Sequence, residues 1–213
     1  MALAPPIGVL GGTFDPIHYG HLRLALEVRE ALDLSEVRLV PNRTPPHRDL
    51  PCIDGARRAA WIKRAIGQNP ELVLDSSELE RDSPSFTVDT LAAMRVERPD
   101  TPLCLILGMD AFAGFLQWRE PERVLELAHL VLVPRPDIQV ALGLTLSNWL
   151  SERSVRDPAR LSATRGGRIY QCTVTPLAIA SRQIRALAAS GRDARFLLPD
   201  AVWTEIQCEG LYR

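Results

Sequence analysis

Two histidines three positions apart, His18 and His21, follow a glycine-containing stretch near the start of the chain. An apolar segment, 7–10, leads into the pair Gly11 and Gly12, where backbone N–H groups without a neighbouring Cβ can approach a bulky anion. A helix beginning after this loop directs its N-terminal dipole and unpaired N–H groups at the same place. Imidazole carries a positive charge readily when a phosphate lies beside it. These residues therefore predict a site for a polyphosphate whose charge changes during a reaction.

The spacing of this stretch differs from that of other phosphate-binding loops. A Walker loop ends in Gly-Lys-Ser/Thr, but the only lysine of the chain is Lys63. A Gly-x-Gly-x-x-Gly pattern is absent, because two residues separate Gly8 from Gly11 and Gly12 follows at once. Zinc binding by the histidines and Asp15 would need further ligands at a recognisable spacing. Ordinary hydrogen bonding at a helix start is the other alternative, and the preceding glycine pair favours the phosphate site.

Two later segments carry weaker patterns of the same kind. Ser181 is placed to cap a helix, with Arg185 one turn further on the same face, so that a hydroxyl, N–H groups and a guanidinium converge on one anion. Gly108 and Asp110 follow an apolar strand, at the sheet edge where ligands of open α/β sheets gather. Asp110 is suited to ribose hydroxyls and Gly108 to a sugar lying on the backbone. The alternative is a turn in which Asp110 caps the next helix.

The elements that must position these residues alternate between strands and helices. Apolar runs predict strands at 7–10, 37–40, 72–74, 103–107, 130–133 and 169–174, and apolar spacing predicts helices from His21, over 56–65, after a capping Thr87, and over 183–189 and 200–207. This alternation predicts an α/β fold, a Rossmann-like doubly wound parallel sheet with helices on both faces. We expect one domain over residues 1–213. Within 134–167, the apolar residues over 140–150 are compatible with a helix packed over the sheet edge, and for the arginine-containing part from Arg153 a solvated loop is favoured over a phosphate-facing lid.

Composition excludes several classes of protein. A net charge of −1 gives no general attraction to nucleic acid or to an anionic membrane, although all basic residues except Lys63 are arginines, which suit phosphate. The four cysteines are far apart, so a disulfide scaffold or zinc ribbon is not expected and a reducing compartment fits. Residues 1–6 lack the features of a signal peptide, and no apolar run is long enough to cross a bilayer. We therefore expect a cytoplasmic protein.

Taken together, the motifs resemble a known family. His18-Tyr19-Gly20-His21 matches the His-x-Gly-His mark of the nucleotidyltransferase superfamily. Several segments together resemble the bacterial nicotinate-nucleotide adenylyltransferase family. They are 11–21, 41–48, 85–91, 108–110, Trp118, 132–136, 181–185, and a last segment that runs from Leu198-Pro199 to Gly210-Leu211-Tyr212. The resemblance covers nearly the whole chain except 137–167. The Ser-Phe-Thr element at 85–87 and Trp118 point to the pyridine-nucleotide branch. Ala180 and Arg182 depart from the family's usual hydroxyl residues.

The resemblance implies adenylyl transfer from ATP to nicotinate mononucleotide, which gives deamido-NAD and pyrophosphate. The attacking phosphate is already anionic, so no protein nucleophile is required, and catalysis comes from alignment and charge stabilisation. The resemblance implies catalytic roles for His18, His21 and Arg185. It implies ATP binding by Gly11, Gly12, Thr13, Phe14, Gly108, Asp110, Arg135, Ile179 and Ser181. It implies nicotinate mononucleotide binding by Asp15, His47, Arg48, Thr87 and Trp118. Mg²⁺ is expected to ride mainly on the ATP phosphates, with no protein metal site.

Other functions remain open from the sequence. A sister transferase, phosphopantetheine adenylyltransferase or a CTP-dependent cytidylyltransferase, shares the histidine loop but should lack the Ser-Phe-Thr element and Trp118. Trp118 is itself open to a second interpretation as a buried packing residue. A non-catalytic nucleotide sensor on the same fold is kept open by Ala180 and Arg182. The sequence does not distinguish nicotinate from nicotinamide mononucleotide, and it leaves the oligomeric state open.

Overall fold

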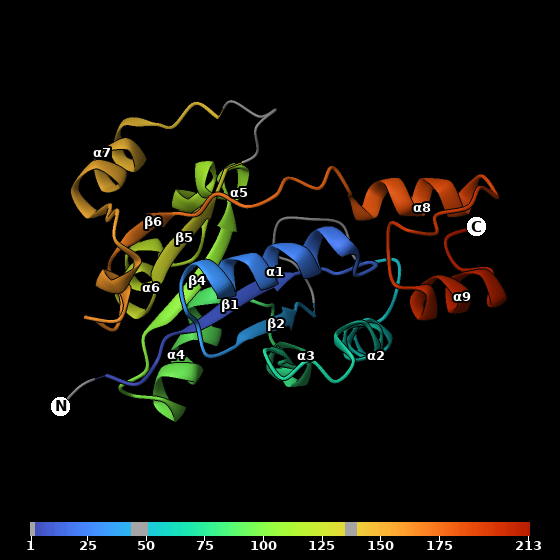
Figure 1. Cartoon of the computed structure of the whole chain (residues 1–213), viewed down its shortest axis with the longest axis horizontal. Helices are drawn as coiled ribbons and strands as arrows, with labels where there is room; N and C mark the ends of the chain where they lie inside the picture. The colour runs from blue at the N-terminus through green and yellow to red at the C-terminus, as the bar shows by residue number, and fades with distance from the viewer. Residues whose placement is uncertain (1–2, 44–50, 135–139) are drawn as a thin grey trace.

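The structure, a computed structural model, describes residues 3–43, 51–134 and 140–213. Its centre is a parallel sheet with the strand order β3-β2-β1-β4-β5-β6 (Figure 1). The strands are β1 (Ile7–Gly12), β2 (Val37–Pro41), β3 (Leu72–Leu74), β4 (Leu103–Gly108), β5 (His129–Val133) and β6 (Ile169–Gln171). The predicted strands are confirmed, and β6 ends three residues earlier than expected. The order reverses at β1 and β4, which are central neighbours although they are far apart in the sequence.

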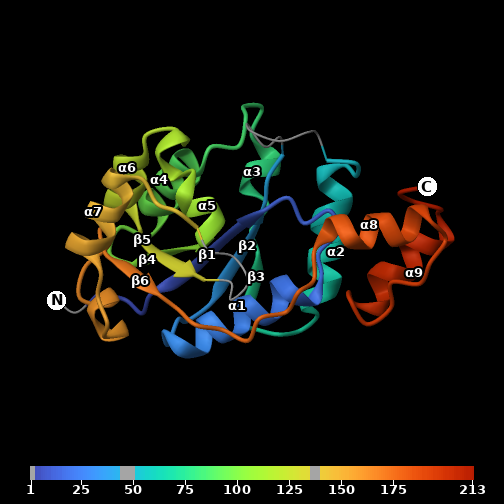
Figure 2. The same ribbon diagram turned by 90° about the horizontal axis from the view of Figure 1, so that it is seen from above.

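Helices cover both faces of this sheet, as predicted. Figure 2 shows α1 on one side, with α4 and α6 on the other. The helices are α1 (Tyr19–Ala31), α2 (Gly55–Ile66), α3 (Ser77–Glu80), α4 (Thr87–Glu97), α5 (Met109–Ala113), α6 (Pro121–Leu127), α7 (Leu144–Arg153), α8 (Ser181–Ala189) and α9 (Asp200–Cys208). Two 3₁₀ turns lie at Phe115–Gln117 and Pro158–Leu161. The architecture is therefore the doubly wound α/β fold.

Strand alternation divides the apolar interior into two cores. Side chains on neighbouring strand positions point to opposite faces of a sheet. In β4, Cys104 and Ile106 join the core under α1, while Leu103, Leu105 and Leu107 join the core under α4 and α6. Because both faces are covered, every residue of β5 is buried. The continuous apolar runs of the central strands follow from this double covering.

The segment before β6 contains the helix that the apolar residues over 140–150 allowed, namely α7. The arginine-containing part that follows includes the turn at Pro158–Leu161, and Arg153, Arg156, Arg160 and Arg165 are exposed there, as expected of a solvated segment. Leu146 is buried in the core under α4 and α6, and Trp149 meets Phe115 edge-on with ring centroids 6.3 Å apart. Leu144 is exposed despite its place in the apolar pattern. Two anchoring contacts are therefore enough to seat this short helix.

Candidate active site

The predicted site residues gather where the strand order reverses. The pairing of β1 with β2 continues to Gly12 opposite Pro41, whereas its pairing with β4 is registered only from Ile7 to Val9. Beyond Val9 the ends of β1 and β4 are no longer held together, which leaves the crevice where open α/β sheets bind ligands. The loop 13–18 leaves β1 at this crevice. Gly108 at the end of β4 begins α5 on the other side.

The histidine pair lies at the first turn of α1. His18 is the N-cap residue with extended backbone angles, and no side chain caps this end of the helix. His18 is 4 % exposed, and its ring stacks on the His21 ring with centroids 3.7 Å apart. Phe14 meets His21 edge-on at 5.0 Å. The structure thus sets two imidazoles face to face beside a helix N-terminus, the arrangement suited to a phosphate.

Gly20, which lies between the two histidines, leaves little room for a side chain, whereas Gly11 has open space around it. A Cβ on Gly20 would lie 3.0 Å from His18 Nδ1 and 3.4 Å from the Ile179 carbonyl oxygen. Gly20 therefore lets the His18 ring and the segment before α8 close on α1. At Gly11, by contrast, an added Cβ would meet nothing within 4 Å.

The second predicted anion motif meets the first one. Arg185 Nη1 donates to the Asp15 carbonyl at 2.6 Å, and Ser181 Oγ donates to the Pro16 carbonyl at 2.9 Å. The expectation that Ser181 caps α8 is wrong, because Ala180 is the N-cap residue and the Ser181 hydroxyl is bonded to the loop. Arg185 uses one of its five N–H donors on this contact. These two hydrogen bonds bring the segment 181–185 against the loop that carries the histidines, so the two sequence motifs lie together in the fold.

Asp15 is buried against protein groups. It is 3 % exposed; Oδ2 accepts the Cys52 backbone N–H at 2.8 Å and Oδ1 accepts the Tyr212 hydroxyl at 2.5 Å. Both carboxylate oxygens therefore have donors from the chain itself. The assignment of Asp15 to nicotinate mononucleotide stays a prediction. The contacts of its carboxylate in the structure are with Cys52 and Tyr212, two residues that support the loop 13–18.

Two residues that support the loop 13–18 were not predicted from the sequence. They are Tyr212, which donates to Asp15, and Arg58, which donates to the Thr13 carbonyl. The Arg58 side chain is 1 % exposed and donates to the carbonyls of Thr13, Asn42 and Ile53 at 2.5–3.0 Å. Burial lowers the pKa of Arg58, while the nearby Asp15 carboxylate acts in the opposite direction. Its place on the apolar face of α2, one turn before Trp61, is the pattern that could have revealed it.

The β4 side of the crevice carries the ribose candidates. Asp110 is exposed in the first turn of α5, and Gly108 rather than Asp110 is the N-cap residue. A Cβ on Gly108 would lie 2.4 Å from Asp110 Oδ1, so a side chain at this position would displace the exposed carboxylate from its present place. On the other side, Gly12 faces the Phe14 ring, and Thr13 Oγ1 accepts from Asn42 Nδ2 at 3.4 Å.

The residues predicted for the pyridine half lie around the start of α4. Thr87 is its first residue and Phe86 the N-cap, so the expectation that Thr87 caps the helix is wrong. Trp118 is half-buried and packs on Phe115 with ring centroids 5.2 Å apart. The adjacent Arg119 lies over the Phe86 ring at 4.9 Å, which joins this loop to the start of α4. His47, Arg48 and Arg135 lie outside the described residues.

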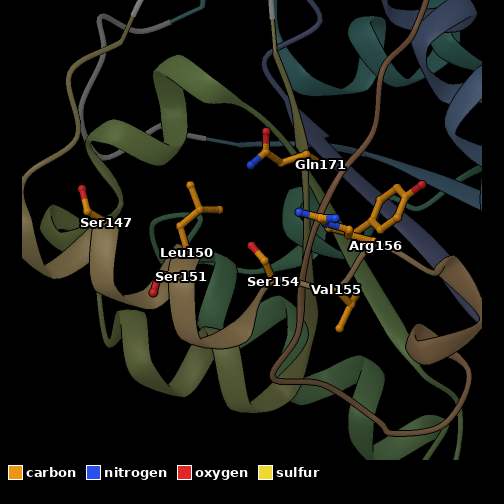
Figure 3. Close-up of a pocket in the computed structure, with 8 residues that line it drawn as sticks. Ser147, Leu150, Ser151, Ser154, Val155, Arg156 and Gln171 are labelled. Carbon is orange, nitrogen blue, oxygen red and sulfur yellow. The ribbon is translucent and has the colours of Figure 1, made fainter.

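Two pockets differ in their relation to this site. One of about 590 Å³ adjoins it and is lined by Cys52, Arg182, Arg185, Ala186, Ala189, Tyr212 and Arg213. Another of about 560 Å³, between α7 and β6, is lined by Ser147, Ser151, Arg156, Gln171 and their neighbours (Figure 3).

Over residues 3–43, 51–134 and 140–213, no group of three or more His, Cys, Asp or Glu side chains could hold a metal ion. No helix in the same ranges is long and apolar enough to cross a membrane.

Comparisons with known proteins agree on one family. The family model described as cytidylyltransferase-like matches residues 9–186. A protein of Aeromonas hydrophila named "Probable nicotinate-nucleotide adenylyltransferase" is 46 % identical over 99 % of both chains. A protein of the same name from Pseudomonas fluorescens is 49 % identical over 97 % of both. The Plasmodium falciparum nicotinic acid mononucleotide adenylyltransferase complexed with NaAD shares the fold, with a TM-score of 0.75, 18 % identity and 98 % of each chain covered.

Proposed function

The chain belongs to the nicotinate-nucleotide adenylyltransferase family, within the cytidylyltransferase-like family, and from this premise we propose how its residues perform the reaction. It is a nucleotidyltransferase of NAD biosynthesis that transfers the adenylyl group of ATP to nicotinate mononucleotide. The products are deamido-NAD and pyrophosphate. The observation that carries the mechanism is the stacked pair His18 and His21 at the N-terminus of α1, beside Arg185.

The chemical step needs alignment more than proton transfer. An oxygen of the nicotinate mononucleotide phosphate attacks the α-phosphorus of ATP, a P–O bond forms, and the bond between the α-phosphorus and the bridging oxygen to the β-phosphorus breaks. The electron pair leaves with pyrophosphate. Negative charge grows on the α-phosphate and on the leaving group, so fixed positive groups at those atoms lower the barrier. We assign this role to His18, His21 and Arg185.

In this proposal the rings of His18 and His21, stacked with centroids 3.7 Å apart, donate hydrogen bonds to the phosphates of ATP. The first-turn N–H groups of α1 add donors aimed at the same phosphate.

The pocket beside Arg185 suits the distal phosphates. Arg182 and Arg213 line it with Arg185, so three guanidiniums surround one space. Arg182 stands where the family usually has a hydroxyl residue, and in this proposal its charge substitutes for that contact. In this proposal Mg²⁺ is bound to the phosphates of ATP and enters the site with that substrate. Mg²⁺ is usually coordinated by water and by phosphate oxygens.

The remaining assignments complete the two substrate sites. Gly11, Gly12, Thr13, Phe14, Gly108, Asp110, Ile179 and Ser181 surround ATP, with Asp110 accepting hydrogen bonds from the ribose. Thr87 and Trp118 hold the pyridine ring and its carboxylate. The widely spaced free cysteines support a cytoplasmic location as part of the same proposal.

The deciding experiment measures pyrophosphate released from MgATP with nicotinate mononucleotide, with nicotinamide mononucleotide, and with neither. We expect rapid release with the nicotinate compound and slower release with the amide. CTP with glycerol phosphate serves as the control for a sister transferase. ATP binding without pyrophosphate release from either mononucleotide would instead indicate a nucleotide sensor.

A further inference from the structure

The hydroxyl of Tyr212 reaches across the fold to the loop that carries the catalytic histidines. It donates to Asp15 Oδ1 at 2.5 Å, a contact between residues 197 positions apart in the sequence. Tyr212 follows α9, has a left-handed φ of +67°, and packs its ring near Trp61. An L-residue adopts this φ only when its surroundings hold it there. The hydrogen bond to Asp15 and the packing near Trp61 place its side chain.

Among the residues that the structure describes, the Tyr212 hydroxyl is one of two hydrogen-bond donors to the Asp15 carboxylate. The second oxygen accepts the Cys52 backbone N–H, and the buried guanidinium of Arg58 supplies positive charge nearby while bonding to carbonyls. Removing one partner of a buried hydrogen-bonded charge leaves that charge under-solvated. Asp15 would then move toward water or another donor.

Movement of Asp15 reaches the catalytic groups directly. The Asp15 carbonyl accepts Arg185 Nη1, the Pro16 carbonyl accepts the Ser181 hydroxyl, and His18 follows two residues later. Burial and the Asp15 carboxylate both raise the pKa of Tyr212 above its ordinary value, so the phenol stays protonated and remains a donor throughout the working pH range. The contact that the Tyr212 hydroxyl makes is with the Asp15 carboxylate, so its effect on the site passes through Asp15.

We propose that Tyr212 is a positioning residue for adenylyl transfer: its bond to Asp15 fixes the loop 13–18, and through that loop the places of His18 and Arg185. The inference rests on the proposed function, since it assigns a purpose to the geometry of that site. It adds a residue from a distant segment to the machinery of the reaction. Because alignment governs the transition state more than substrate binding, its loss should lower kcat and leave KM nearly unchanged.

The test compares Tyr212→Phe with Tyr170→Phe, a matched change in β6 beside the other pocket. We expect Tyr212→Phe to lower kcat about tenfold, on the scale of one lost hydrogen bond to a charged group, with KM for both substrates within about twofold. Tyr170→Phe should behave as wild type. Melting curves confirm that both variants are folded.

Histidine NMR gives a second readout that does not depend on turnover. The chain has four histidines, so their ring Cε1–H signals can be assigned by single substitutions. Tyr212→Phe should shift the His18 and His21 signals and leave that of the buried His129 in place. Should Tyr212→Phe not fold, Asp15→Asn, which keeps an acceptor for Tyr212, is read by the same signals.

The outcomes separate the two proposals. Wild-type kcat together with unmoved His18 and His21 signals in Tyr212→Phe would overturn the role of Tyr212 and leave the proposed function intact. An inactive wild-type protein would overturn the proposed function, while the histidine signals still report on the contact. In a double-mutant cycle with Asp15→Ala, which removes the acceptor, Tyr212→Phe should lower kcat much less than it does in the wild type; fully additive losses would count against the link.

Discussion

In the proposed mechanism, the stacked imidazoles of His18 and His21 stabilise the charge of the transition state. His18→Ala or His21→Ala should lower kcat by roughly 10²–10³, the scale for losing an electrostatic donor to the transition state. The fold should persist, because the stability of α1 comes from Leu22, Ala25 and Val28 on its buried face. Steady-state kinetics with a melting curve checks both statements. Near-normal turnover in either variant would contradict the assigned role.

Arg182 tests whether the departure from the family pattern carries function. Its guanidinium lines the pocket beside Arg185, so Arg182→Ala should raise the KM for ATP about fivefold, a change of about 1 kcal/mol in binding, and leave KM for the mononucleotide unchanged. Arg192→Ala is the matched control, since Arg192 is exposed beyond the end of α8 and bonds to Ser190. Equal KM values for ATP in the two variants would show that Arg182 is only a solvated side chain.

The first turn of α1 is packed so tightly that a methyl group should impair it. In Gly20→Ala the new Cβ would crowd the His18 ring, at 3.0 Å from Nδ1, and we expect the ring to shift from its stacked place on His21. We expect kcat to fall at least tenfold with little loss of stability, because alanine is a better helix former than glycine. Gly143→Ala at the start of α7, where a Cβ meets nothing within 4 Å, is the control. Unchanged kcat in Gly20→Ala would remove the steric argument.

His129, at the start of β5, ties this strand to the loop before β6 only in its neutral form. Nδ1 accepts the Arg168 backbone N–H at 3.1 Å, and Nε2 as the protonated nitrogen donates to the Thr164 carbonyl at 2.8 Å. Burial lowers the pKa of His129 below its ordinary value of 6.5. His129 therefore becomes protonated near pH 6.5 in the unfolded chain, but only at a lower pH in the folded chain. Its contribution to stability is present above pH 6.5 and is lost as the pH falls through the folded-state pKa.

Urea unfolding at pH 7.5 and 5.5 measures this linkage. The free energy of unfolding of the wild type should decline as the pH falls, by at most about 1.4 kcal/mol per pH unit from this one proton. His129→Gln should be less stable at pH 7.5 yet decline less steeply. Parallel pH dependence in the two proteins would show that His129 does not carry the effect.

For the molecule as a whole, the supports of the loop 13–18 should respond to ligand together. They come from three separate segments: α2 with Arg58, α8 with Ser181 and Arg185, and the residues after α9 with Tyr212. ATP at about one hundred times its Kd adds about 2.7 kcal/mol to stability. Hydrogen exchange with and without ATP should show slower exchange in all three segments as well as in the loop. Protection confined to the loop and the start of α1 would mean that the supports do not act as one unit.

The sequence was informative wherever the signal was local. Apolar runs located the strands, and glycines and histidines at fixed spacing located the loop after β1. It was less informative where a contact spans the chain. A hydroxyl at a helix start is an ordinary cap by pattern, yet Ser181 bonds to Pro16, 165 residues away. Arg58 and Tyr212 could not be placed beside Asp15 without the fold. The apolar residues over 140–150 allowed the helix at 144–153, but its place could not be fixed from the sequence, because Leu146 and Trp149 pack against distant elements.

The central place of β1 in the sheet has a consequence for refolding. Its two neighbours differ greatly in sequence separation: β2 follows after one helix, whereas β4 is drawn from about a hundred residues away. Pairings of high contact order form late, because loop closure must precede them. A chain diluted from denaturant should thus regain helical circular dichroism first, then tryptophan burial, and catalytic turnover last.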